Sequence, residues 1–164
     1  NPQSVYGRTK LEGEQAIKKS GCLYLIIRTA WLYSGYGHNF VKTISRLASE
    51  RDELNVVNDQ WGTPTYAGDL AVAIIRIMER DDLPELEGVY HFTNEGACTW
   101  YDFAKEIVAI TGAKCKVNPV TTGEYPSKAK RPAYSILDKT KIKETFDLEI
   151  RDWREALKSC MATF

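Results

Sequence analysis

Residues 4–28 read SVYGRTKLEGEQAIKKSGCLYLIIR. Ser4 is a favourable helix N-cap and Gly21 a favourable helix stop, so the stretch predicts a helix from Ser4 to about Lys19. The apolar run Leu23–Arg28 then predicts a short buried strand. A helix followed at once by a buried strand is typical of α/β proteins.

The same alternation continues along the chain. Further helices are predicted over residues 40–51, 69–79, 100–110, 139–146 and 152–162, and strands over 54–57, 88–93 and 117–120, with a loop over 121–132. Thr99 and Gly112 are the expected N-cap and stop of the 100–110 helix. The sequence therefore predicts an α/β fold with a partly parallel sheet. The expected apolar helix positions are Phe40, Ile44, Leu47, Leu70, Ala73, Ile74, Ile77 and Met78.

Composition narrows the class of protein. The 164 residues are 43% hydrophobic and 27% charged, which is typical of a globular domain with a real core. The 22 basic and 22 acidic residues cancel, so no nucleic-acid or anionic-membrane partner is expected. No apolar run approaches the roughly 20 residues of a membrane span, and a cytoplasmic protein without a signal peptide is expected.

Cysteine and histidine usage gives no metal site. The four cysteines, at 22, 98, 115 and 160, lack paired spacing, so free thiols are expected rather than a zinc site or a disulfide framework. Two histidines leave little material for a metal centre or a Ser-His-Asp triad.

Tyr6 and Lys10 carry the clearest chemistry. Four residues apart on a helix, they lie one above the other on one face. A phenol has a pKa of about 10, and a nearby lysine cation favours the phenolate, so the pair is a candidate proton donor for carbonyl reduction. The spacing alone is weak evidence, because Tyr101 and Lys105 repeat it within an apolar helix where Phe103 is expected in the core.

A glycine-rich phosphate loop is not found in the sequence. The single Gly-x-Gly, Gly35-Tyr36-Gly37, is followed by Phe40 rather than a third glycine, and it comes after the Tyr6/Lys10 pair. The expectation is that the loop binding a dinucleotide lies upstream, and that this chain is the back portion of a longer enzyme.

Six motifs run in order along nearly the whole chain: YGRTKLEGE (6–14), RTAWLY (28–33), GHNFV (37–41), VNDQWGTPT (57–65), RPAYS (131–135) and DWREAL (152–157). Together they resemble the dTDP-4-dehydrorhamnose reductase family of the extended short-chain dehydrogenase/reductases. The resemblance implies the C-terminal part of a Rossmann-like fold plus the small substrate-binding domain. Residues 1–95 would complete the Rossmann-like domain, with the catalytic helix and interleaved substrate-binding segments, and residues 96–164 would be mainly substrate-binding.

The resemblance also implies an activity. It is NADPH- or NADH-dependent reduction of the 4-keto group of dTDP-4-dehydrorhamnose to dTDP-L-rhamnose, in nucleotide-sugar and polysaccharide biosynthesis. An N-terminal half of the same protein would supply the glycine-rich loop, the first strands and the Ser or Thr of the catalytic triad, so the isolated chain is expected to be inactive. A homodimer through the helix that carries Tyr6 is expected by analogy. A role for Mg²⁺ has no support in the sequence.

Roles near the cofactor follow from the same resemblance. Tyr6 would donate the proton to the sugar C4 oxygen, and Lys10 would assist it and hold the nicotinamide ribose. Ala30 would lie against the nicotinamide. Glu12 and Glu14 are expected on a solvated helix face.

The implied substrate-binding positions each have a structural alternative. Trp31 is a sugar contact or a core aromatic, and Asn39 and Phe40 begin a helix at the diphosphate or only cap it. Gln60, Thr63 and Pro64 would shape the sugar pocket or a turn. Arg131 would bind phosphate through its guanidinium or make a surface ion pair. The complete set is Trp31, Asn39, Phe40, Gln60, Thr63, Pro64 and Arg131.

Two other functions stay open at this point. A relative of these reductases is the non-catalytic regulatory subunit of a methionine adenosyltransferase, so a binding module of the same fold is one alternative. Another nucleotide-sugar epimerase or dehydratase is the second. The pair Tyr6 and Lys10 favours an enzyme, and the signatures RTAW (28–31) and RPAY (131–134) favour the reductase.

Overall fold

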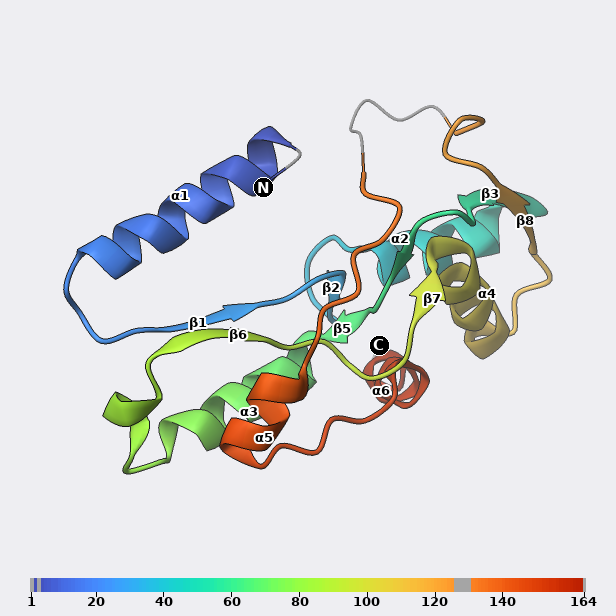
Figure 1. Ribbon diagram of the computed structural model, residues 1–164. Coiled ribbons are helices and arrows are strands. Elements are labelled where there is room, and N and C mark those ends of the chain that lie inside the picture. The colour runs from blue at the N-terminus through green and yellow to red at the C-terminus, as the bar shows by residue number, and fades with distance from the viewer. Residues whose placement is uncertain (1, 3, 126–130, 164) are drawn as a thin grey trace.

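The computed structural model describes residues 2, 4–125 and 131–163 and has an α/β architecture, as predicted (Figure 1). The helices are α1 (Val5–Lys19), α2 (Phe40–Glu50), α3 (Ala67–Met78), α4 (Trp100–Thr111), α5 (Thr140–Phe146) and α6 (Trp153–Met161), with a 3₁₀ turn, η1 (Leu83–Leu86). The strands are β1 (Leu25–Arg28), β2 (Leu32–Tyr33), β3 (Glu53–Val57), β4 (Trp61–Gly62), β5 (Thr65–Tyr66), β6 (Gly88–His91), β7 (Cys98–Thr99) and β8 (Lys116–Val120).

Helix ends follow their predicted signals. The Ser4 hydroxyl accepts a hydrogen bond from the Gly7 N–H at 3.1 Å and begins α1. Thr99 begins α4 in a capping box with Asp102, each side chain bonding the other's backbone N–H. Gly112 ends α4 in the left-handed region, at φ 68°, where a glycine carries no steric cost.

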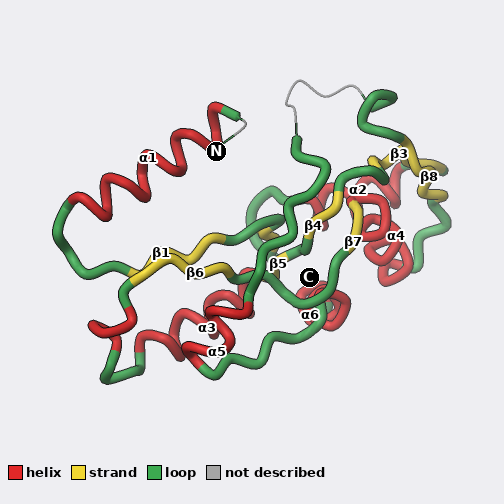
Figure 2. Tube along the Cα trace, in the orientation of Figure 1, coloured by secondary structure: helices red, strands yellow, loops and turns green. Residues whose placement is uncertain are grey.

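The strands of the described residues pair two at a time (Figure 2). β1 pairs with β6, β2 with β5 and β3 with β8, all in parallel, whereas β4 and β7 are antiparallel. The sequence predicted the longer strands β1, β3, β6 and β8 but not the two-residue strands. Residues 126–130 of the predicted 121–132 loop lie outside the described residues.

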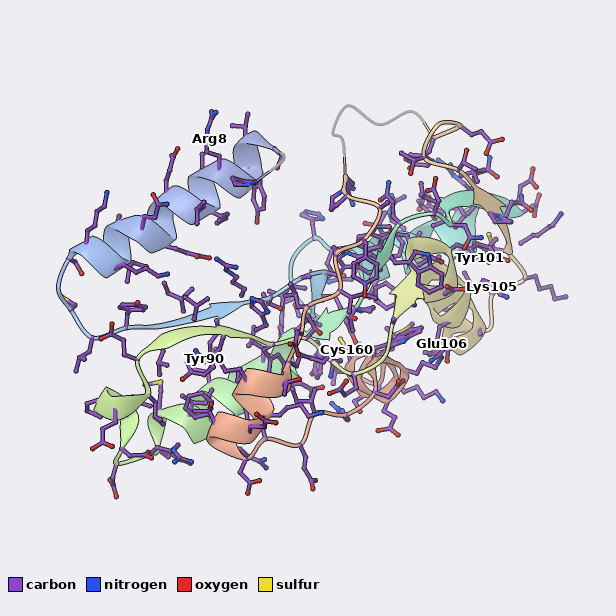
Figure 3. The ribbon with its side chains drawn as sticks, in the orientation of Figure 1. Arg8, Tyr90, Tyr101, Lys105, Glu106 and Cys160 are labelled. Carbon is purple, nitrogen blue, oxygen red and sulfur yellow. The ribbon has the colours of Figure 1, made fainter. Side chains whose placement is uncertain are left out.

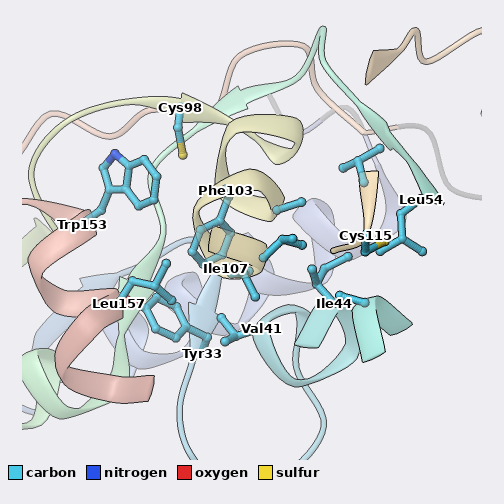
Figure 4. Close-up of a cluster of buried hydrophobic side chains, with 14 of the residues drawn as sticks. Tyr33, Val41, Ile44, Leu54, Cys98, Phe103, Ile107, Cys115, Trp153 and Leu157 are labelled. Carbon is cyan, nitrogen blue, oxygen red and sulfur yellow. The ribbon is translucent and has the colours of Figure 1, made fainter. Parts of the chain in front are cut away.

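Two hydrophobic cores hold these elements. The first lies between α2, α4, α6 and β3, and Figure 4 shows Tyr33, Phe103, Trp153 and Leu157 meeting at its centre. The second joins α3, β6 and α5 through Ala73, Ile77, Tyr90, Phe92, Ile142 and Phe146. Each core takes residues from both sides of the predicted boundary at 95/96, and that boundary stays a prediction.

Two helices keep apolar side chains in solvent. No residue of α1 is buried, and Val5 and Ile17 are 67% and 45% exposed. In α3 the predicted apolar side was partly wrong: Ala73 and Ile77 are buried, but Met78 is 69% exposed. A helix that is apolar nearly all round gives no single face to sequence periodicity.

Candidate active site

Tyr6 and Lys10 lie on the open surface of α1. Tyr6 is 73% exposed, and Lys10 Nζ lies 5.5 Å from the centre of its ring, which confirms that the two share a helix face. Tyr101 and Lys105 have nearly the same geometry, at 5.3 Å, and Figure 3 shows them on α4. The tyrosines differ in burial, because Tyr101 is half-buried against the first core whereas Tyr6 is exposed; both lysines are exposed.

An ion pair joins α1 to β1. The Glu14 carboxylate accepts two hydrogen bonds from Arg28, from Nε at 2.7 Å and Nη2 at 2.6 Å. The expectation that Glu14 faces solvent was wrong: its side chain is only 14% exposed, whereas that of Glu12 is 61% exposed. The hydrogen bonds that the Arg28 guanidinium donates, together with its positive charge, stabilise the Glu14 carboxylate and so lower the pKa of Glu14.

Trp31 lies three residues beyond the carboxyl end of β1, the end of a strand at which α/β proteins bind ligands. Its backbone is in the left-handed region, at φ 48°, and its half-buried indole stacks on Trp100 with ring centres 3.6 Å apart. The Thr65 hydroxyl donates to the Ala30 carbonyl at 2.7 Å, and the Thr65 N–H donates to the Trp31 carbonyl at 3.1 Å. These bonds fix the chain where the sugar and nicotinamide contacts were predicted.

A groove of about 540 Å³ lies beside Trp100, between α2, β3 and the segments on either side of residues 126–130. The Arg131 guanidinium lies 5.6 Å from the Trp100 ring centre, and the Phe40 ring is 4.6 Å from it. The predicted residues Phe40, Gln60 and Arg131 line the groove. The sequence analysis missed other lining residues, among them Leu47, Arg51, Trp100 and Tyr125.

Hydrogen bonds fix one wall of the groove. Gln60, 7% exposed, donates from Nε2 to the Thr122 hydroxyl at 3.0 Å. That hydroxyl donates to Asp59 at 2.6 Å, and the Thr122 N–H also bonds the same carboxylate. These hydrogen bonds from Thr122 stabilise the Asp59 carboxylate and lower the pKa of Asp59.

Three predicted substrate residues make structural contacts instead of lining the groove. Asn39 caps α2, since its Oδ1 accepts from the Lys42 N–H at 3.1 Å, and its Nδ2 donates to the Ser34 carbonyl. Thr63 is fully buried and donates to the Gly96 carbonyl at 2.8 Å, and Pro64 is buried beside it. The cap and turn alternatives account for these contacts.

Other chemistries find little support. Across residues 2, 4–125 and 131–163, no three His, Cys, Asp or Glu side chains gather in a way that could hold a metal ion. The cysteines are unpaired, and burial raises the pKa of Cys98 to about 12 and that of Cys160 to about 11, which disfavours the reactive thiolate. Each helix in the described part of the chain is too short or too polar to cross a bilayer.

The predicted site residues therefore form two groups, one at the groove and the other, Tyr6 and Lys10, on α1. Phe40, Gln60 and Arg131 share the groove, and Trp31 adjoins it through Trp100. Tyr6 and Lys10 are not among the residues that line the groove.

Known proteins resemble this chain along nearly its whole length. The sequence model of the RmlD substrate binding domain matches residues 1–164. The dTDP-4-dehydrorhamnose reductase of Aggregatibacter actinomycetemcomitans is 45% identical over 99% of this chain and 58% of its own length. The spore coat polysaccharide biosynthesis protein SpsK of Bacillus subtilis is 42% identical over 96% of this chain and 54% of its own length.

Solved structures have the same fold. The dTDP-4-dehydrorhamnose reductase from Bacillus anthracis, solved in complex with NADP, superposes with a TM-score of 0.94 at 41% identity, over 100% of this chain and 57% of that one. A UDP-N-acetylglucosamine 4-epimerase from Bacillus cereus, with a TM-score of 0.74 at 23% identity over 99% of this chain and 57% of that one, shares the fold alone. The chain spans little more than half the length of the curated relatives it matches. It belongs to the RmlD substrate-binding domain family and has the α/β fold of the extended short-chain dehydrogenase/reductases.

Proposed function

We propose that this chain is the substrate-binding part of a dTDP-4-dehydrorhamnose reductase. The reaction is NAD(P)H-dependent reduction of the 4-keto group of dTDP-4-dehydrorhamnose to dTDP-L-rhamnose, for polysaccharide biosynthesis. The observation that carries the proposal is the groove, whose volume of about 540 Å³ suits a nucleotide. Arg131 offers a planar guanidinium for the diphosphate, and the apolar wall formed by Phe40 and Leu47 suits the thymine ring.

The chemistry is assigned to α1. Bound NAD(P)H would supply the hydride, and the Tyr6 hydroxyl would give the proton to the C4 oxygen of the sugar. Lys10, on the same helix face, stabilises the phenolate that remains and holds the nicotinamide ribose. Ala30 borders the nicotinamide and Trp31 borders the sugar.

The exposed face of α1 supports a division of the enzyme between two halves. Tyr6 is mostly in solvent, and no residue of α1 is buried against the described chain. We infer that a cofactor-binding half covers this helix in the longer protein and brings the nicotinamide to Tyr6. A homodimer through α1 stays a prediction, which sedimentation of the protein with and without that half would test.

The two alternatives are less well supported. Several relatives at 38–45% identity are named as the reductase, which does not favour a regulatory module. Epimerases match this chain at about half that identity and so share its fold only.

Matched tyrosine variants test the proposal. In a preparation that includes the cofactor-binding half, Tyr6→Phe should lower kcat for the dTDP-keto sugar by about 10²–10⁴, because it removes the proton donor. Binding of dTDP-L-rhamnose should be unchanged. The control is Tyr101→Phe, which has the same spacing to a lysine and should keep full turnover. Normal turnover by Tyr6→Phe would refute its role, and a wild type that does not oxidise NADPH with the dTDP-keto sugar would refute the function.

A further inference from the structure

The backbone of Trp31 is strained. Its φ of 48° is in the left-handed region, which a bulky residue rarely adopts. Such a conformation persists only where the surroundings determine it. The indole is half-buried and packs against the edge of the first core.

Two close contacts hold the Trp31 indole in place. Its ring is nearly parallel to that of Trp100, with an interplanar angle of 13° and ring centres 3.6 Å apart. On Gly62, a Cβ would lie 2.5 Å from the indole carbons Cε2 and Cζ2, so only a glycine lets the ring approach this closely. Among the described residues, Trp31 is held by packing and not by a hydrogen bond of its side chain.

Trp100 is itself on a rigid support. It is the first residue of α4 and lies within the capping box that Thr99 and Asp102 form. The preceding strand β7 pairs with β4, which places Cys98 opposite Gly62. One turn further along α4, Phe103 is fully buried in the first core. A ring in this position is well placed to orient a neighbour, since precise sites are built on regular elements.

Trp100 also faces the groove. It is one of the lining residues, and both Phe40 and Arg131 contact its ring. The same indole therefore contacts the residue assigned to the sugar, Trp31, and the residue assigned to the diphosphate, Arg131.

We propose that Trp100 is a positioning residue, which fixes the Trp31 indole against the sugar and sets its place relative to the nucleotide in the groove. This inference rests on the proposed function. Its distinguishing consequence is that loss of the Trp100 ring weakens recognition of the sugar more than recognition of the nucleotide.

The test compares two probes, dTDP and dTDP-L-rhamnose, by calorimetry with the cofactor-binding half present. The dissociation constant of dTDP divided by that of dTDP-L-rhamnose measures how much the sugar adds to the affinity. In Trp100→Leu this ratio should fall by about fivefold to tenfold, the size expected for one lost aromatic pair. Trp100→Phe keeps a flat ring on α4 and should restore most of the ratio, and Trp31→Leu should reproduce the loss.

A spectroscopic readout tests the stack without any ligand. Two stacked indoles give a coupled pair of bands in far-ultraviolet circular dichroism, which should be present in the wild type and lost in both Trp100→Leu and Trp31→Leu. Absence of the couplet from the wild type would overturn the inference. So would an equal loss of affinity for dTDP and dTDP-L-rhamnose in Trp100→Leu, which would make Trp100 a platform for the nucleotide, or no loss for either. A wild type that shows the couplet but binds neither probe would refute the proposed function, and with it the inference.

Discussion

Replacing Asn94 by alanine is expected to destabilise the fold strongly, although the residue lies in no core cluster. Asn94 is fully buried. Its Oδ1 accepts a hydrogen bond from the Tyr66 N–H at 2.8 Å, at the start of α3. Its Nδ2 donates a hydrogen bond to the Asp69 carboxylate at 2.6 Å, and that carboxylate also accepts a hydrogen bond from the Arg151 guanidinium.

The magnitude follows from these contacts. Loss of the bond to a carboxylate costs about 1.5–3 kcal/mol, and a neutral bond about 1 kcal/mol, with more if the Tyr66 N–H is left unpaired. Water entering the small space left by the side chain offsets part of this. We therefore expect Asn94→Ala to lower the free energy of unfolding by about 2–4 kcal/mol.

Urea denaturation followed by circular dichroism measures this change. The matched control is Asn118→Ala, because Asn118 also donates its amide to a carboxylate, that of Glu53 at 2.9 Å, but does so at the protein surface. Exposed hydrogen bonds exchange readily with water, so the control should lose less than about 1 kcal/mol. If Asn94→Ala lowers the free energy of unfolding by no more than Asn118→Ala does, then burial does not strengthen the hydrogen bonds of Asn94, and the prediction is wrong.

Three further changes have defined outcomes. Glu14→Gln should speed amide hydrogen exchange throughout α1, because this helix has no buried residue and loses its ion pair with Arg28. In the wild type the same increase in exchange should appear as the pH falls below about 4.5. Arg28 lowers the pKa of Glu14, so the ion pair is lost only when the pH is low enough to protonate that carboxylate. Gly62→Ala should cost about 1–3 kcal/mol in urea denaturation, since the new Cβ has a ring carbon at 2.5 Å, whereas Gly123→Ala, with its nearest atom at 3.9 Å, should be nearly neutral. Arg131→Ala should weaken dTDP binding in calorimetry by about tenfold or more, through loss of a charge-assisted contact.

Contrary results are equally concrete. Exchange in α1 that is the same in Glu14→Gln and wild type would show that other contacts hold the helix. A stability of Gly62→Ala equal to that of Gly123→Ala would mean that the neighbouring indole moves freely. Unchanged dTDP affinity in Arg131→Ala would move the diphosphate elsewhere.

Helix ends and the longer strands were predictable because their signals are local. Ser4, Thr99 and Gly112 act on backbone groups within a few residues, so sequence alone located the ends of α1 and α4 to within about two residues. The two-residue strands were not predictable, since they have no periodicity of their own. β4, for example, exists through its pairing with β7, far along the chain.

The candidate site was predictable only in part, for the same reason. The motifs singled out Trp31 and Arg131 as residue types suited to a sugar and a phosphate. That Trp100 contacts both depends on the tertiary approach of three distant segments, and the sequence analysis treated Trp100 only as the start of an apolar helix. A tryptophan in the first turn of a well-capped helix is the signal that was available.

Glu14 illustrates the opposite error. Helical periodicity placed it among charged neighbours, as on a solvated face. Its partner Arg28 comes from the adjacent strand, and no periodicity within α1 reports that approach.

The first core is completed by the last helix of the chain. Trp153, Leu157 and Cys160 of α6 are fully buried there against residues from much earlier in the sequence, such as Tyr33 and Phe103. During synthesis on the ribosome, those earlier aromatic residues therefore stay partly exposed until α6 has emerged and packs against them. A premature stop before α6 would release a chain with its core uncovered, a natural substrate for chaperones and proteases.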